Sequence, residues 1–466
     1  MTAKPANPVV LVRRCEGYDA AAIERLVVEG MERFGYRPAG KVFVKPNVVF
    51  AGDPKVFGRT AYTDPALVGA CLRVLARGPG VARVTMGENS AIGFPTRHCF
   101  RHAGYYDEVE RVARAARCPV DLVCMEEEPR DTVAVNGVVH QSLRLARSLA
   151  RADTKVYLPK LKCHCVRKMT GAVKLNIGIC CADDRAIRHD FMLDEKIVDL
   201  LTVGWPDFVV MDAIDVGVGN EAFPTPRRLG LVLMGTNPLA VDLVGARLLG
   251  LGVDDVPYLA AAVRRGYGPA RVEEVVLEGD LTSLGALDEQ ARRVLPYDDE
   301  FHAWQDVQHE LDRLGAPMRL VWGPHRRGAG ERCETGCVMA IKMFLASYEK
   351  YAGPAAFATA KPVVFVVGKP DEVVDGRGAE VFLIGTCAQA ARTVNAKKVV
   401  PVDHCFTTAS DLTFAIGTRL GMPAPSRDAK MVGGLVRDFA RAGVGKLFSR
   451  RLLQDLGRRG GHEQGD

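Results

Sequence analysis

The sequence predicts an α/β protein in which a mostly parallel sheet is flanked by helices, with a second, smaller α/β domain that carries a cysteine cluster. Strand-like and helix-like segments alternate from about residue 9 to residue 251, and a second alternating pattern begins near Arg332. The strand-like segments are short, nearly continuous apolar runs, which are typical of strands buried on both faces of a parallel sheet. A chain of 466 residues is also long enough for two or three domains.

The first α/β domain is expected at residues 1–260. Apolar runs predict strands at residues 7–14, 41–50, 81–89, 154–162, 207–217 and 229–237. One helix is predicted at residues 19–35, where apolar residues recur at three- and four-residue spacing, and another at residues 66–77. Thr63, Asp64 and Pro65 precede the second helix and form a typical N-terminal cap. Functional residues in such sheets gather at the carboxyl ends of the strands.

The remainder of the chain divides into three predicted parts. Residues 261–330 are charged, helical in pattern and interrupted by proline and glycine, which indicates a helical connector. The small domain is expected at residues 331–445, with its elements at residues 338–353, 362–368, 379–385, 397–403 and 410–421. Residues 446–466 are a basic tail.

Composition and charge exclude several classes of function. The net charge of +6 is small for this length, and basic residues are mixed with acidic ones, unlike the concentrated basic patches of nucleic-acid-binding proteins. No apolar run approaches the roughly 20 residues that span a bilayer. The N-terminus lacks the apolar core of a secretion signal. We therefore expect a cytoplasmic protein that binds neither nucleic acid nor a membrane.

Four of the thirteen cysteines lie at the ends of elements in the small domain. Cys333 and Cys337 occupy a loop-to-helix junction, and Cys387 and Cys405 each follow directly on a predicted strand. Disulfides are rare in the cytosol, and four thiolates are the common ligand set of iron–sulphur clusters. We predict a 4Fe–4S cluster at these residues. A zinc site, or four unrelated buried thiols, stays open as an alternative.

The other cysteines give weaker signals. Single cysteines in apolar surroundings are interpreted as small buried hydrophobic residues, namely Cys15, Cys71, Cys99, Cys118 and Cys124. A second thiol group lies in the first domain, where a second metal site stays open at Cys163, Cys165, Cys180 and Cys181.

The densest polar chemistry of the first domain runs from Tyr157 to Asp199. Cations and histidines so close to a strand end indicate a site for a small anionic substrate, although a solvated lysine face is the alternative. We predict catalytic roles for His164, His189 and Lys174. The predicted substrate-binding residues are Lys45, Asn47, Lys160, Lys162 and Asn176. The backbone N–H groups that follow Thr170 and Gly171 could also receive phosphate or carboxylate.

Several of these motifs resemble a known family. The runs VFVKPNVV, TDPALV, LPKLKCH, TGAVKLNIG and GTNPLAVDLVGARLLGL, in this order over about residues 41–260, are similar to the domain of unknown function 362 family. The resemblance implies a shared α/β domain and a redox context, since members of this family are often joined to iron–sulphur modules. It implies no particular reaction. The chain departs from the family in lacking cysteines at two-residue spacing, and in carrying Cys180 and Cys181 where an apolar helix start is usual.

These observations favour an iron–sulphur oxidoreductase that acts on a small anionic substrate and receives electrons from a donor protein. A non-catalytic electron-transfer or sensor module is one alternative. A non-redox metal-dependent enzyme with a structural zinc in the C-terminal domain is the other. A GxSxG elbow and a glycine-rich dinucleotide fingerprint are both missing from the sequence, which disfavours a serine hydrolase and a Rossmann-type cofactor site.

Overall fold

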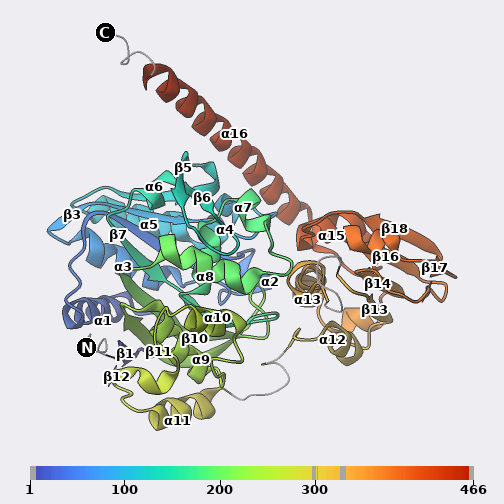
Figure 1. Ribbon diagram of the computed structural model, residues 1–466, viewed down its shortest axis with the longest axis horizontal. Helices are drawn as coiled ribbons and strands as arrows, with labels where there is room; N and C mark the ends of the chain where they lie inside the picture. The colour runs from blue at the N-terminus through green and yellow to red at the C-terminus, as the bar shows by residue number, and fades with distance from the viewer. Residues whose placement is uncertain (1–6, 296–300, 302, 326–331, 461–466) are drawn as a thin grey trace.

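The structure is a computed structural model that describes residues 7–295, 301, 303–325 and 332–460, with the backbone alone described beyond residue 445. Its first domain is built on a ten-stranded mixed sheet (Figure 1). The main path of the sheet runs in the order β12 (Val276–Gly279), β1 (Val9–Arg14), β11 (Thr225–Gly235), β10 (Phe208–Val218), β7 (Thr154–Leu158), β2 (Ala39–Pro46), β3 (Gly80–Glu88) and β4 (Val120–Cys124). Strand β11 is antiparallel to both its neighbours, whereas the strands from β10 to β4 are parallel.

Two hydrophobic cores lie on opposite faces of this sheet. Side chains of β10 alternate between them, with Val209 and Met211 in one core and Val210 and Ile214 in the other. One core is covered by α1 (Ala20–Arg33), α3 (Pro65–Ala76) and α5 (Tyr105–Ala115), and the other by α8 (Leu193–Gly204), α9 (Pro238–Leu248), α10 (Pro257–Arg264) and α11 (Leu284–Val294). This arrangement confirms the predicted α/β class.

The predicted strand at residues 154–162 is two strands in the structure, β7 and β8 (Lys160–His164). They separate at Pro159, which lacks the N–H group needed for an uninterrupted ladder. Strand β8 continues beside β10 and turns back through the short antiparallel strand β9 (Lys168–Thr170). This turn places His164 and Cys165 beyond the edge of the main sheet, toward the second domain.

The second domain has a parallel four-stranded sheet in the order β13 (Met318–Trp322), β14 (Val363–Val367), β16 (Glu380–Ile384) and β18 (Lys398–Val402). Helices α13 (Met339–Ala352) and α15 (Ala409–Ile416) contribute to the core between this sheet and the first domain. That core also contains Phe50 and Phe223 of the first domain, so the two domains share one apolar interface.

The predicted connector at residues 261–330 is not a separate unit. Its first part supplies β12 and α11 to the first domain, and its last part supplies α12 (Val307–Arg313) and β13 to the second. Strand β13 pairs with β14 along its full length. The charged, helix-like composition of the surrounding residues gave no indication of this long-range pairing.

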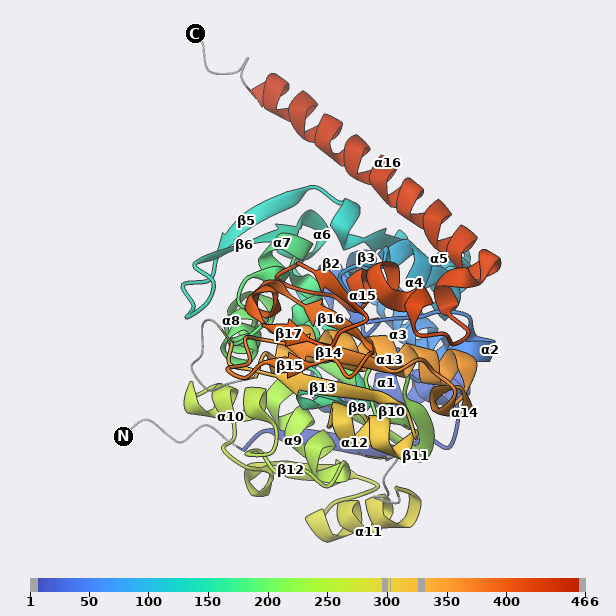
Figure 2. The same ribbon diagram turned by 90° about the vertical axis from the view of Figure 1, so that its right-hand side faces the viewer.

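A long C-terminal helix, α16 (Ala429–Gly460), crosses the predicted boundary at residue 445 and projects away from both domains (Figures 1 and 2). Its buried Asp438 accepts a hydrogen bond of 2.8 Å from Arg101, and His98 Nδ1 lies 3.2 Å from the same carboxylate. Both partners belong to α4 (Thr96–Ala103), so the start of α16 is anchored on the first domain. The last six residues of the predicted basic tail lie outside the described chain. Within the described part, no helix is long and apolar enough to cross a membrane.

Candidate functional site

The segments that carry the four predicted cysteine ligands meet around Cys337. Cys333 and Cys337 lie on one turn of π-helix before α13, and the Cys337 N–H donates to Cys333 Sγ at 3.5 Å. Cys337 Sγ lies 3.6 Å from the hydroxyl of Thr407, two residues after Cys405. Gly385, two residues before Cys387, approaches so closely that a Cβ there would lie 2.5 Å from Cys337 Sγ.

Glycines complete the surroundings of this cysteine cluster, which we define as Cys333, Cys337, Cys387 and Cys405. A Cβ at Gly336 would lie 2.7 Å from Cys333 Sγ, so both glycines open space around sulphur. The contact between the two thiols lowers the pKa of Cys333 and raises that of Cys337, so the thiolate is favoured at Cys333 alone. The four cysteines are free and the segments that carry them adjoin, which suits a four-thiolate centre, and an iron–sulphur cluster at these residues stays a prediction.

A cavity of about 180 Å³ lies between the two domains, directly beside the cysteine cluster. Thr407 belongs to its wall and also contacts Cys337, so the cavity and the cysteines share a side chain. The polar wall includes His164, Lys174, Arg185, His189 and Glu221, and the aromatic wall consists of Phe50, Phe94, Phe223 and Phe406. The three predicted catalytic residues thus line one cavity; their catalytic roles stay predictions.

Three basic side chains of the cavity wall have nitrogen atoms without a partner among the described residues. Lys174 Nζ makes no hydrogen bond or ion pair there. Arg185 Nε and His189 Nδ1 are buried and unpaired, although the other nitrogens of Arg185 donate to carbonyl groups of Ser90, Asn89 and Cys180. Unpaired buried polar groups cost free energy, so this wall is prepared for a ligand that accepts hydrogen bonds.

His189 joins the cavity to the cysteine cluster. Its carbonyl oxygen accepts a 2.6 Å hydrogen bond from the hydroxyl of Thr335, which lies between Cys333 and Cys337. Its ring meets the ring of Phe406 edge-on, with centroids 5.0 Å apart. Residues of both domains therefore fix the imidazole between the thiols and the cavity.

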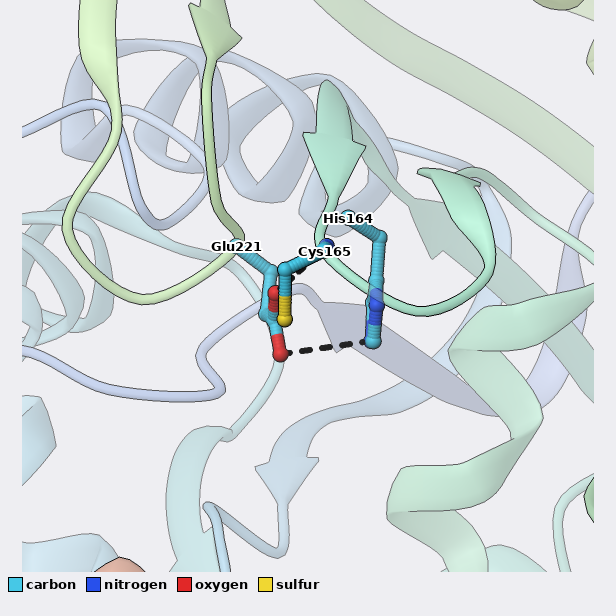
Figure 3. A group of neighbouring side chains, drawn as sticks. All are labelled: His164, Cys165 and Glu221. Carbon is cyan, nitrogen blue, oxygen red and sulfur yellow. Dashed lines mark hydrogen bonds and ion pairs between the residues drawn. The ribbon is translucent and has the colours of Figure 1, made fainter. Parts of the chain in front are cut away.

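His164, Cys165 and Glu221 form a group whose ligand atoms all lie within 4.8 Å of one another, close enough to hold a metal ion (Figure 3). The hydrogen bonds of His164 argue for a different role. Its Nδ1 accepts the backbone N–H groups of Val166 and Arg167, which leaves the proton on Nε2. Nε2 lies 3.4 Å from Glu221 Oε1, so this nitrogen faces the carboxylate as a donor and offers no lone pair to a metal.

The electrostatic surroundings of His164 also disfavour a cation. Burial is the largest cause that holds its pKa well below the usual value, followed by the charges of Lys174, Lys162, Arg167 and Lys342. A metal ion would meet the same repulsion. The geometry therefore supports a neutral imidazole that holds a proton toward Glu221.

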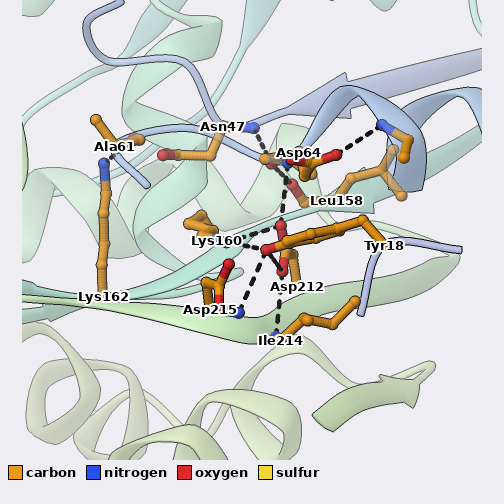
Figure 4. Close-up of polar contacts among 12 residues, drawn as sticks. Tyr18, Asn47, Ala61, Asp64, Leu158, Lys160, Lys162, Asp212, Ile214 and Asp215 are labelled. Atoms are coloured by element: carbon orange, nitrogen blue, oxygen red, sulfur yellow. Dashed lines mark hydrogen bonds and ion pairs between the residues drawn. The ribbon is translucent and has the colours of Figure 1, made fainter. Parts of the chain in front are cut away.

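The predicted substrate-binding residues Lys160 and Lys162 lie inside the first domain (Figure 4), and neither is among the residues that line the cavity. Lys160 Nζ donates to Asp212 at 2.9 Å and to the Tyr18 hydroxyl at 2.8 Å. Lys162 donates to the carbonyl groups of Ala61 and Glu221. Both ammonium groups are fully buried and satisfied by the protein, so substrate binding by these lysines is not supported.

The other three predicted substrate-binding residues are also absent from the cavity wall. Lys45 is fully buried and donates to the buried carboxylate of Glu88. Asn176 accepts a 2.8 Å hydrogen bond from the Tyr157 hydroxyl, and the backbone of Asn47 is held by Thr63. Position at a strand end predicted an open crevice, but Lys45 and Asn176 each have a partner inside the fold, whereas the buried Asn47 Oδ1 has no partner among the described residues.

The loop after Thr170 and Gly171 does bind a carboxylate, but one that belongs to the protein. Asp242, on α9, accepts the N–H groups of Ala172 at 2.6 Å and Val173 at 2.9 Å. A Cβ at Gly171 would collide with this carboxylate. The predicted anion site of this loop is therefore occupied by the Asp242 side chain.

Sequence reasoning missed Arg185 and the segment from Phe406 to Thr413, which both line the cavity. Arg185 stands among alternating acidic and basic residues, and that pattern resembles a solvated helix. The four thiols of the possible second metal site, Cys163, Cys165, Cys180 and Cys181, are buried, and burial raises the pKa of Cys163 and of Cys180 to about 12. Of these four, Cys165 lies in a group whose ligand atoms are within 4.8 Å of one another.

Comparison with known proteins agrees with the predicted resemblance. Residues 42–247 match the family described as domain of unknown function (DUF362). The thylakoid-associated protein sll1697 of Synechocystis sp. is 27% identical over 277 residues, which cover 57% of this chain and 81% of that protein. The lactate racemase apoprotein of Thermoanaerobacterium thermosaccharolyticum is 11% identical with a TM-score of 0.33, and the match covers 52% of this chain and 57% of that one. A protein of Thermotoga maritima is 12% identical with a TM-score of 0.30, over 54% of this chain and 60% of its own. The central region of this chain thus carries the sequence pattern of the DUF362 family.

Proposed function

We propose that the protein is an iron–sulphur oxidoreductase that acts on a small anionic substrate bound in the interdomain cavity. One observation carries this proposal. A cavity whose basic wall has unpaired nitrogen atoms shares Thr407 with the site where Cys337 meets the segments that carry Cys387 and Cys405. A substrate there would lie beside the thiols, whereas a purely electron-transferring module needs no such cavity.

The residues of the cavity divide the work as follows. Lys174 and Arg185 bind the anionic group, and the phenylalanine rings exclude water from it. His164 holds a proton on Nε2 beside Glu221, within the same wall. When bound at the cysteine cluster, an iron–sulphur centre exchanges single electrons with a donor protein.

Anaerobic purification followed by absorption spectroscopy and iron and sulphide analysis tests the proposal. We expect a broad band at roughly 400 nm and stoichiometric iron in the wild-type protein. Both should be lost when Cys387→Ser is combined with Cys405→Ser. Cys118→Ser, at a half-buried cysteine of the first domain, is the control and should retain both. A colourless wild-type protein without iron would overturn the proposal.

Binding of a small carboxylate should weaken as the pH rises through about 8. Burial lowers the pKa of Lys174 to about 8, while Glu221, Cys165 and Asp194 raise it and Arg167 lowers it further. The ammonium form is present below this pKa and binds the anion, which in turn raises the lysine pKa in the complex. The affinity should therefore fall by up to about tenfold per pH unit between the two pKa values. Titration with acetate at pH 6 to 10 measures it, and a flat profile would contradict a role for Lys174.

A second candidate is a non-redox metal-dependent enzyme with a structural zinc at the cysteine cluster, since four free thiols are also a ligand set for zinc. It predicts zinc in place of iron in the same metal analysis. We also propose that the protein is cytoplasmic. The name of the Synechocystis relative associates that protein with a membrane, so cell fractionation is the appropriate test.

A further inference from the structure

The size, charge and lining of the interdomain cavity define a narrower class of ligand. We propose that the cavity binds a monocarboxylate carrying a single aromatic ring, of the size of benzoate. This inference rests on the proposed function only in treating the cavity as the substrate site.

Charge limits the ligand to a monoanion. Lys174 and Arg185 each bring one positive charge to the wall and Glu221 brings one negative charge. His164 and His189 are neutral, since burial holds the pKa of both well below the usual value. The residues that line the cavity therefore sum to a net charge of +1, which one carboxylate neutralises, whereas a dianion would add a second negative charge that no lining residue compensates.

Unpaired atoms identify the groups that receive the carboxylate. Arg185 is 6% exposed and His189 is 7% exposed, and each retains an unpaired ring or guanidinium nitrogen. Glu221 is the largest favourable charge acting on Lys174, which also lines the cavity. The Arg185 guanidinium is already held by three backbone carbonyl groups, so it cannot swing away to find another partner. Because these donors are already fixed, binding a carboxylate costs little side-chain conformational entropy.

The apolar part of the wall fits an aromatic ring. Four phenylalanines line it, and Phe50 makes edge contacts with Phe94 and Phe223 at centroid distances of 5.1 Å. Met339 and Met343 also line it, and thioether sulphur favours aromatic neighbours. An apolar cavity of about 150 Å³ accommodates benzene, so 180 Å³ leaves room for one ring and one carboxylate. On that precedent a fused pair of rings would need a cavity larger than 180 Å³.

Isothermal titration of the full-length protein with four probes tests this inference. We expect benzoate to bind with one-to-one stoichiometry, and benzyl alcohol, phthalate and 2-naphthoate to bind at least tenfold more weakly. Lys174→Met should weaken benzoate binding at least tenfold, while the exposed-lysine control Lys430→Met should not change it. Phe223→Leu should weaken it several-fold and leave acetate binding unchanged.

Each contrary outcome overturns a defined part of the proposal. Equal binding of benzyl alcohol would remove the requirement for charge, and equal binding of 2-naphthoate would remove the size limit. If Lys174→Met leaves the benzoate affinity unchanged, the binding site lies elsewhere. If benzoate does not bind at all, the proposed ligand class is refuted. Metal analysis separates these failures from failure of the proposed function. If the protein contains iron but does not bind benzoate, this inference alone is refuted. If the protein lacks iron but binds benzoate, the redox role alone is refuted.

Discussion

Gly385→Ala should abolish the metal centre although it removes none of the four thiols. The added methyl group would lie 2.5 Å from Cys337 Sγ, and that sulphur is itself held between Cys333 and Thr407. The sulphur would have to move out of its position in the cysteine cluster. We expect complete loss of the visible absorption and of bound iron, with the far-ultraviolet circular dichroism of a folded protein retained.

Gly353→Ala is a matched control for this experiment. Gly385 has φ 85° and ψ 161°, and Gly353 has φ 83° and ψ 155°, a region that costs other residues of order 1–3 kcal/mol. A Cβ at Gly353 meets no described atom within 4 Å. Both variants therefore carry the same backbone strain, and the collision with sulphur distinguishes them. Equal iron content in the two variants would show that Gly385 does not shape the centre.

Lys45→Met should destabilise the protein by about 3–5 kcal/mol and leave the benzoate affinity of the folded fraction unchanged. Lys45 is fully buried on β2, and its ammonium group pairs with Glu88, which is 3% exposed. Removing Lys45 leaves the Glu88 carboxylate buried without its ion-pair partner, with Arg185 as the remaining cation that acts on it. The midpoint of urea-induced unfolding measures the loss, and titration of benzoate into the folded protein measures the affinity.

Two further variants make this prediction specific. Lys41→Met changes an exposed lysine on the same strand and should alter the free energy of unfolding by less than about 0.5 kcal/mol. The double variant Lys45→Met with Glu88→Leu removes the unpaired charge and should recover much of the lost stability. A stable Lys45→Met protein with weakened benzoate binding would instead return Lys45 to the substrate site.

The sequence was sufficient to predict the fold class because that class depends on local patterns. Continuous apolar runs predicted the central strands, and β10, whose alternate residues enter two different cores, shows why such runs need no polar face. The strand β13 was missed because its pairing partner lies about 45 residues further along the chain. Nothing in a window around Met318 records that pairing.

The candidate site was predictable in part. His164, His189 and Lys174 line one cavity, and their crowding in the sequence was the useful signal. Substrate binding by Lys45, Lys160 and Lys162 stays a prediction, and residue type and position at a strand end did not reveal that each has a partner inside the fold. Lys160 with Asp212 and Lys45 with Glu88 are contacts between residues far apart in the chain. The cavity residues between Phe406 and Thr413 belong to the second domain. The sequence does not show how the two domains pack together, so it could not predict that these residues line the cavity.

The hydrogen bonds between Asp242 and the loop after Gly171 also bear on how this chain can vary. The aspartate and the loop belong to two motifs about 70 residues apart, and two hydrogen bonds join them. The two sequence motifs look independent, but in the folded protein they form the two halves of one structural contact. Related chains should therefore keep or lose the two motifs together. The presence of both motifs in two proteins is then evidence of a shared fold more than of a shared reaction.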